Sequence, residues 1–166
     1  MRRLLLAAAA ACSLAACAGT PTETVAPPPT SAASAGVWAY AFDAGPGIAT
    51  AVLTGADNQP LVKLACQSPN GDLVVTDWTF SRVRQGDAPT TFAVGAQSKQ
   101  VTARIAGDGA GRQALVMTLP SRDPMWNALS PSARVTTTAL GFTHNWAPES
   151  ASRINDVLNS CRSLGS

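Results

Sequence analysis

Apolar and polar residues alternate with a period of two over much of the chain between residues 37 and 146. Trp38, Tyr40 and Phe42 show the pattern, which is typical of a strand with one buried face. Turn-forming residues separate such segments, as at Asn70-Gly71, a pair that favours a tight hairpin. We predict strands over 37–42, 48–53, 61–66, 73–83, 90–94, 99–105, 114–119, 134–140 and 141–146.

The pattern changes near the C terminus, where apolar residues recur at helical spacing. This spacing predicts a helix over 148–162, with one apolar face formed by Ile154, Val157, Leu158 and Cys161. A short helical turn is expected from Asp123, a possible cap, to Leu129, with Pro124 at its first position. The fold is therefore predicted to be mainly β: an antiparallel sandwich or barrel-like sheet closed by one C-terminal helix.

The N terminus has the layout of a secretory signal peptide. Two arginines follow Met1, and an apolar run then extends from Leu4 to Ala16, too short to cross a bilayer. The run ends in Leu14-Ala15-Ala16-Cys17, which resembles the lipobox of bacterial lipoproteins. That resemblance implies cleavage before Cys17 and attachment of lipid to it. Two alternatives are ordinary cleavage at an Ala-x-Ala site and lipidation of Cys12.

The lipoprotein resemblance also predicts a location. Residue 18 is alanine and not the aspartate that retains such proteins in the inner membrane, so the expected site is the outer membrane, facing the periplasm. We therefore divide the chain into a signal peptide (1–16), a lipidated cysteine with a disordered tether (17–36) and one β-rich domain (37–166). Residues 18–36 carry a single charge, Glu23, and too few apolar groups to offset the entropy of ordering.

Charge excludes one class of partner. The chain has 12 basic and 10 acidic residues, but loss of Arg2 and Arg3 with the signal peptide would leave ten of each. A neutral chain without runs of like charge lacks the basic surface that nucleic acids require. The expected partners are the membrane, through the lipid, and an envelope protein.

Cys66 and Cys161 are the cysteines left in the predicted domain. Because the periplasm is oxidising, we expect them to form a disulfide that joins the terminal helix to the sheet. The alternative is a cysteine nucleophile with His144, the only histidine, as its base.

The sequence lacks the residue sets that other catalytic and metal sites require. A serine hydrolase would also have to use His144, and the Gly-x-Ser-x-Gly motif is absent. One histidine and a bonded cysteine pair do not supply the ligands of a zinc site. We therefore assign no catalytic residue and expect no metal and no cofactor.

The chain has four tryptophans, and most are expected in the core. Trp126 follows Met125 on the short irregular segment after Pro124. We predict that Trp126 and Met125 form an exposed binding anchor, because aromatic residues of this kind are common at binding hot spots.

Three segments together resemble a group of small periplasmic proteins. They are the opening strand with Trp38, the 61–66 strand that leads into 73–80, and a terminal helix with a cysteine near its end. These segments are similar to proteins of the invasion-associated locus B type and to accessory proteins linked to type VI secretion. The resemblance implies a β-sandwich with a disulfide from a strand to the C-terminal helix, and it transfers no catalytic residues.

The leading expectation is a non-catalytic, lipid-anchored periplasmic domain that binds a protein or another envelope component. Two alternatives are a hydrolase that uses His144 and a barrel that binds a small ligand.

Overall fold

The computed structural model describes residues 30–45, 47–67, 70–81 and 84–164. These residues form ten strands, two short 3-10 helices and one α-helix. The strands are β1 (Thr30–Ala33), β2 (Val37–Asp43), β3 (Ile48–Thr54), β4 (Pro60–Gln67), β5 (Asp72–Asp77), β6 (Gly86–Val94), β7 (Gln97–Gly107), β8 (Gln113–Leu119), β9 (Val135–Ala139) and β10 (Phe142–Asn145). The helices are η1 (Trp78–Phe80), η2 (Pro124–Ala128) and α1 (Ser150–Leu164).

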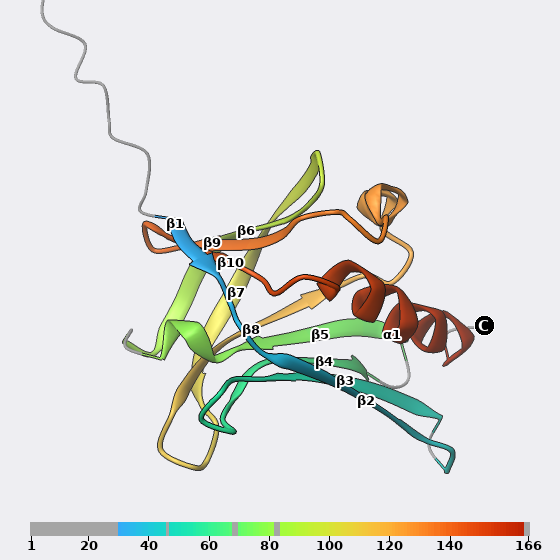
Figure 1. Ribbon diagram of the computed structural model, residues 1–166, viewed down its shortest axis with the longest axis horizontal. Coiled ribbons are helices and arrows are strands. Elements are labelled where there is room, and N and C mark those ends of the chain that lie inside the picture. The colour runs from blue at the N-terminus through green and yellow to red at the C-terminus, as the bar shows by residue number, and fades with distance from the viewer. Residues whose placement is uncertain (1–29, 46, 68–69, 82–83, 165–166) are drawn as a thin grey trace, which may run out of the picture.

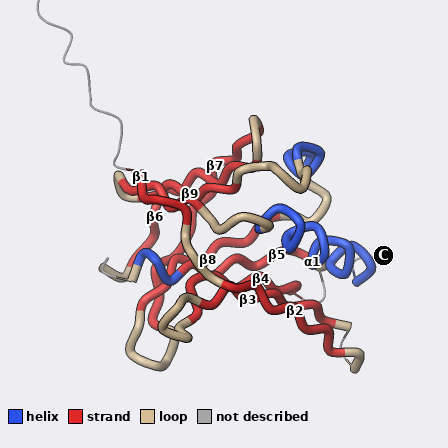
Figure 2. Tube along the Cα trace, in the orientation of Figure 1, coloured by secondary structure: helices blue, strands red, loops and turns tan. Residues whose placement is uncertain are grey.

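All ten strands belong to one sheet, with the order β1-β10-β9-β6-β7-β8-β5-β4-β3-β2. The sheet curls into a half-barrel, and α1 lies at its open side (Figure 1). Neighbouring strands are antiparallel except β1 and β10, which are parallel. The tube view shows how strands make up most of the described chain (Figure 2). The mainly β fold with one C-terminal helix is confirmed, and the sheet has the curled, barrel-like form.

The predicted alternation places apolar side chains inside the curl. In β3, for example, Ala49, Ala51 and Leu53 are fully buried, while the residues between them are partly exposed. Phe92 of β6 lies in the core with its ring edge-on to Trp126 and Trp146. Burial of such aromatic side chains stabilises each by a few kcal/mol.

Helix α1 covers this core with the apolar face that the sequence predicts. Ile154, Val157 and Leu158 are fully buried, and the helix packs against β3, β4 and β5. A disulfide joins Cys161 of α1 to Cys66 of β4, with Cα atoms 5.2 Å apart. The predicted pairing of the two cysteines is therefore confirmed.

Two of the differences from the predicted boundaries have a clear physical cause. Residues 30–33, assigned to the disordered tether, form strand β1, because the free edge of β10 supplies backbone partners that composition does not reveal. The strand predicted to run to residue 83 ends at Asp77, whose side chain turns back and accepts a hydrogen bond from the Thr79 amide at 3.0 Å. The predicted signal peptide and Cys17 lie outside the described residues.

Strands β1 and β2 are consecutive in the chain but form opposite edges of the sheet. Residues 34–36 connect them, so the two edges meet at this corner of the half-barrel. At Gly36 a Cβ atom would lie 2.6 Å from the Thr54 carbonyl oxygen and 2.9 Å from Leu53 Cδ1. Only glycine fits this close approach without a shift of the backbone.

Candidate functional site

The residues singled out in the sequence do not form one site. Cys17 lies outside the described residues, so its lipidation stays a prediction. None of the helices within the described ranges has the length and apolar character needed to span a bilayer.

The prediction that Trp126 and Met125 form an exposed anchor is wrong. Both side chains are 4% exposed. The indole Nε1 of Trp126 donates a hydrogen bond to the Pro120 carbonyl at 2.7 Å, and its ring packs on Phe92. Asp123 caps η2 as predicted, and the short helix turns the apolar pair into the core instead of toward solvent.

His144 lies in a small polar group on the buried face of the sheet. His144 is 1% exposed, and the neighbouring Asp77 and Thr137 are fully buried. Thr137 accepts a hydrogen bond from Trp146 Nε1 at 3.0 Å. Buried polar side chains are costly unless they are hydrogen-bonded, so the partners of this group define what it can do.

Each ring nitrogen of His144 has a partner from a distant part of the chain. His144 Nδ1 lies 2.7 Å from Asp77 Oδ2, and His144 Nε2 lies 2.5 Å from Ser34 Oγ. The other carboxylate oxygen, Asp77 Oδ1, accepts from the Thr79 amide at 3.0 Å and from Thr79 Oγ1 at 2.5 Å. Ser34, His144 and Asp77 thus form a continuous line, which we call the polar chain.

The partners of the polar chain indicate where its protons lie. Asp77, as a carboxylate, is an acceptor, so His144 Nδ1 carries the proton between them. With a proton on Nδ1 alone, Nε2 is an acceptor to which the Ser34 hydroxyl can donate. A hydroxyl, an imidazole and a carboxylate in this order have the relative roles of a nucleophile, its base and the group that orients the base.

Three separate elements position the polar chain. Asp77 ends β5, His144 lies on β10, and Ser34 directly follows β1, where its amide donates to the Asn145 carbonyl at 3.0 Å. The Ser34 side chain is half-buried, and its neighbours Ala33 and Ala35 are exposed. Ser34 is therefore the least buried member of the polar chain.

The sequence identified His144 but missed its two partners. One signal for Asp77 was present, because it follows Leu73 and Val75 at inward positions of the same strand, where an acid needs a buried partner. The alternative that pairs a cysteine nucleophile with His144 is wrong, since Cys66 and Cys161 are bonded to each other.

Strand β2 forms a second feature, at the free edge of the sheet. Its residues pair with β3 without a register shift, and six of its seven side chains are exposed. Val37 is 76% exposed, Tyr40 42% and Phe42 55%. Tyr40 and Phe42 also line an open groove of about 450 Å³, whose other side is formed by Asp156, Asn159, Ser160 and Ser163 of α1.

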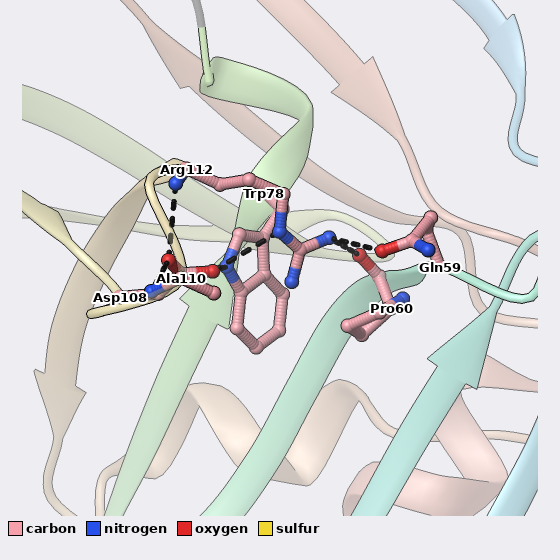
Figure 3. Close-up of polar contacts among 6 residues, drawn as sticks. All are labelled: Gln59, Pro60, Trp78, Asp108, Ala110 and Arg112. Atoms are coloured by element: carbon pink, nitrogen blue, oxygen red, sulfur yellow. Dashed lines mark hydrogen bonds and ion pairs between the residues drawn. The ribbon is translucent and has the colours of Figure 1, made fainter.

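An exposed cluster around Arg112 links three turns of the sheet (Figure 3). The Arg112 guanidinium lies 5.2 Å from the Trp78 ring centre, and Trp78 Nε1 donates to Asp108 at 3.0 Å. Loss of solvent would raise the pKa of Asp108, but hydrogen bonds from Ala110, Arg112 and Trp78, with the Arg112 charge, outweigh it and lower that pKa. Because the acidic and basic groups satisfy each other, we interpret this cluster as a structural support.

Across the described ranges, no group of three or more His, Cys, Asp or Glu side chains is placed to hold a metal ion. In comparisons with known proteins, no family model, no curated protein and no solved structure matches the chain. The resemblance to the locus B type and to secretion-associated proteins therefore stays a prediction.

Proposed function

We propose that this protein is an exported lipoprotein of the cell envelope whose domain binds an extended segment of another envelope protein along strand β2. The anchor and the compartment rest on the signal peptide and lipobox pattern that ends at Cys17. The binding role rests on one observation, the exposed edge of β2.

The β2 edge lacks the usual protection of an edge strand. Natural edge strands carry lysines, prolines or bulges that prevent pairing with another chain. The sequence from Val37 to Asp43 contains no lysine or proline, and its pairing with β3 is regular along its full length. Within the described residues, β3 is the only strand that pairs with β2. Backbone donors and acceptors on the other side are thus available to an added strand.

The chemistry of the edge favours a protein segment with apolar side chains. Backbone N–H and C=O groups need hydrogen-bond partners at strand spacing, which a polypeptide supplies and a lipid does not. Tyr40 and Phe42 offer aromatic surface to alternate side chains of that segment. Asp43 is the single charge of β2, and Asp156 lines the neighbouring groove. A basic residue beside the apolar positions would complement these carboxylates.

Site-specific photo-crosslinking in intact cells tests the proposal. A benzophenone amino acid replaces Tyr40 in the full-length protein, and cross-linked peptides are identified by mass spectrometry. We expect one partner protein, joined through an extended apolar segment. Phe42→Lys should reduce the yield at least tenfold, because a buried lysine opposes strand addition.

Leu140 offers a matched control, since it is 52% exposed but lies in the turn between β9 and β10. Leu140→Lys should leave the yield unchanged. The absence of a discrete partner would contradict the proposal. An equal reduction of the cross-linking yield by Phe42→Lys and Leu140→Lys would contradict it as well. A cross-link to a second copy of the chain would contradict the proposed occupant and indicate self-association through β2.

A further inference from the structure

We propose that Ser34 is the nucleophile of an acyl-transfer site in which His144 acts as the base and Asp77 orients it. This activity is separate from the docking of a partner on β2, and each proposal is tested by its own experiment.

The arrangement of the three side chains carries the inference. The Ser34 hydroxyl reaches the imidazole nitrogen that is free to accept its proton, at 2.5 Å. Asp77 holds the opposite nitrogen at 2.7 Å and is itself fixed by two hydrogen bonds from Thr79. A base and a group that orients it, each within hydrogen-bond reach, are what a serine needs to become a nucleophile.

The burial gradient along the polar chain also fits this role. Asp77 is fully buried and His144 is 1% exposed, whereas Ser34 is half-buried beside exposed alanines. A substrate can therefore approach the hydroxyl from solvent while the base and the carboxylate stay in surroundings of low dielectric constant, which strengthen their interaction.

The proposed reaction is hydrolysis of an ester. Ser34 Oγ attacks the carbonyl carbon, its proton moves to His144 Nε2, and the carbon–alkoxide bond breaks as Nε2 returns the proton to the departing alcohol. Water then attacks the acyl-serine and gives one proton to Nε2. The Oγ–carbon bond breaks, the carboxylic acid leaves, and Oγ recovers the proton. The net change is ester plus water to acid plus alcohol.

The composition of the segment that carries Ser34 indicates the substrate class. Residues 32–42 contain no charged side chain, and small or aromatic residues predominate. An uncharged ester with a short apolar acyl group suits this composition. Trp38, four residues from Ser34, packs on Trp146, and its Nε1–H is shielded from solvent and has no partner in the described structure.

Labelling with a fluorophosphonate probe tests the site directly. The full-length protein with its disulfide intact is treated with the probe, the modified peptide is mapped, and hydrolysis of p-nitrophenyl butyrate is measured in parallel. We expect the phosphonate on Ser34, and Ser34→Ala should abolish both labelling and hydrolysis. His144→Gln and Asp77→Asn should slow labelling at least about 100-fold, the low end of what a positioned base contributes.

Ser98→Ala is the matched control, because Ser98 is an exposed serine on β7, and this variant should react like the wild type. Absence of label on Ser34 in the folded wild-type protein would overturn the inference without any variant. Equal labelling rates in the wild type and in a folded Asp77→Asn protein would also overturn it, because Ser34 would then react without help from the polar chain.

Discussion

Asp123 combines two stabilising roles in one side chain. It caps η2 by accepting a hydrogen bond from the Met125 amide at 3.0 Å, and it pairs with Lys99 of β7. The hydrogen bond from Lys99 is the largest effect on the Asp123 carboxyl, followed by the Met125 amide, and together they lower its pKa below the ordinary value. Because η2 carries Met125 and Trp126 into the core, this carboxylate supports packing as well as a turn.

The lowered pKa of Asp123 makes part of the stability dependent on pH. A carboxyl with a lowered folded-state pKa stabilises the protein fully above its unfolded value near 4, and the contribution is lost as the pH falls through the folded-state pKa. Asn can still cap the helix, so Asp123→Asn removes mainly the charge. We expect it to lower the free energy of unfolding at pH 7 and to have little effect near pH 2, as measured by urea unfolding at both pH values.

Asp123→Ala removes the cap too and should cost roughly 1 kcal/mol more at pH 7. The ion pair is partly exposed, so 1 M NaCl should reduce the effect of Asp123→Asn. If Asp123→Asn lowered the free energy of unfolding equally at pH 7 and pH 2, the assigned role of the charge would be contradicted.

At the scale of elements, α1 closes the open side of the half-barrel and is joined to β4 by a disulfide. The disulfide joins residues that are 95 positions apart, so it restricts the unfolded chain strongly. We expect reduction to lower the free energy of unfolding by about 4–5 kcal/mol on the chain-entropy model. Guanidinium unfolding with and without reductant measures this.

The double variant Cys66→Ala/Cys161→Ala provides the control for that measurement. It should match the reduced wild type and should not respond to reductant. If the free energies of unfolding of the oxidised and reduced wild type differed by less than about 1 kcal/mol, packing of the apolar face alone would hold α1 in place.

Most elements could be predicted because their period reflects a buried face within the segment itself. Leu73 and Val75 are buried at alternate positions of β5, and Ile154 and its neighbours form the buried face of α1. The composition of β1 carries no such signal, since its residues are Thr, Ser and Ala and the strand forms by pairing with β10. Hydrogen bonding to a strand that is distant in the sequence is a tertiary effect, so the residues of the segment itself do not reveal it.

The polar chain could not be assembled from the sequence for the same reason. Ser34 and His144 are 110 positions apart, and Asp77 and His144 are 67 apart. Only the curl of the sheet brings the end of β5, the middle of β10 and the segment after β1 together. His144 could be singled out because it is the only histidine, whereas the serine and the aspartate each had many equivalents.

At the scale of the whole molecule, the predicted lipid fixes where the domain can act. Several acyl chains on Cys17 would hold the protein on a membrane, since each buried CH₂ contributes about 0.8 kcal/mol. We expect Cys17→Ser to move the protein from the membrane fraction to the soluble periplasmic fraction and to abolish incorporation of labelled palmitate.

Cys12→Ser tests the alternative acceptor and serves as the control. It should leave both the membrane association and the palmitate label unchanged. Loss of the label in the Cys12 variant alone would assign the lipid to that cysteine, and retention of both properties in Cys17→Ser would contradict the anchor.

The adjacency of β1 and β2 in the chain has a mechanical consequence. An anchor before β1 and a partner on β2 would be separated by little more than residues 30–43, although these strands lie at opposite edges of the sheet. Tension between a membrane and a bound protein would travel along this short covalent path and bypass the core. The first contacts to rupture under load would be those that hold β1 to β10, and Ser34 would be pulled from His144 while the rest of the domain stayed folded.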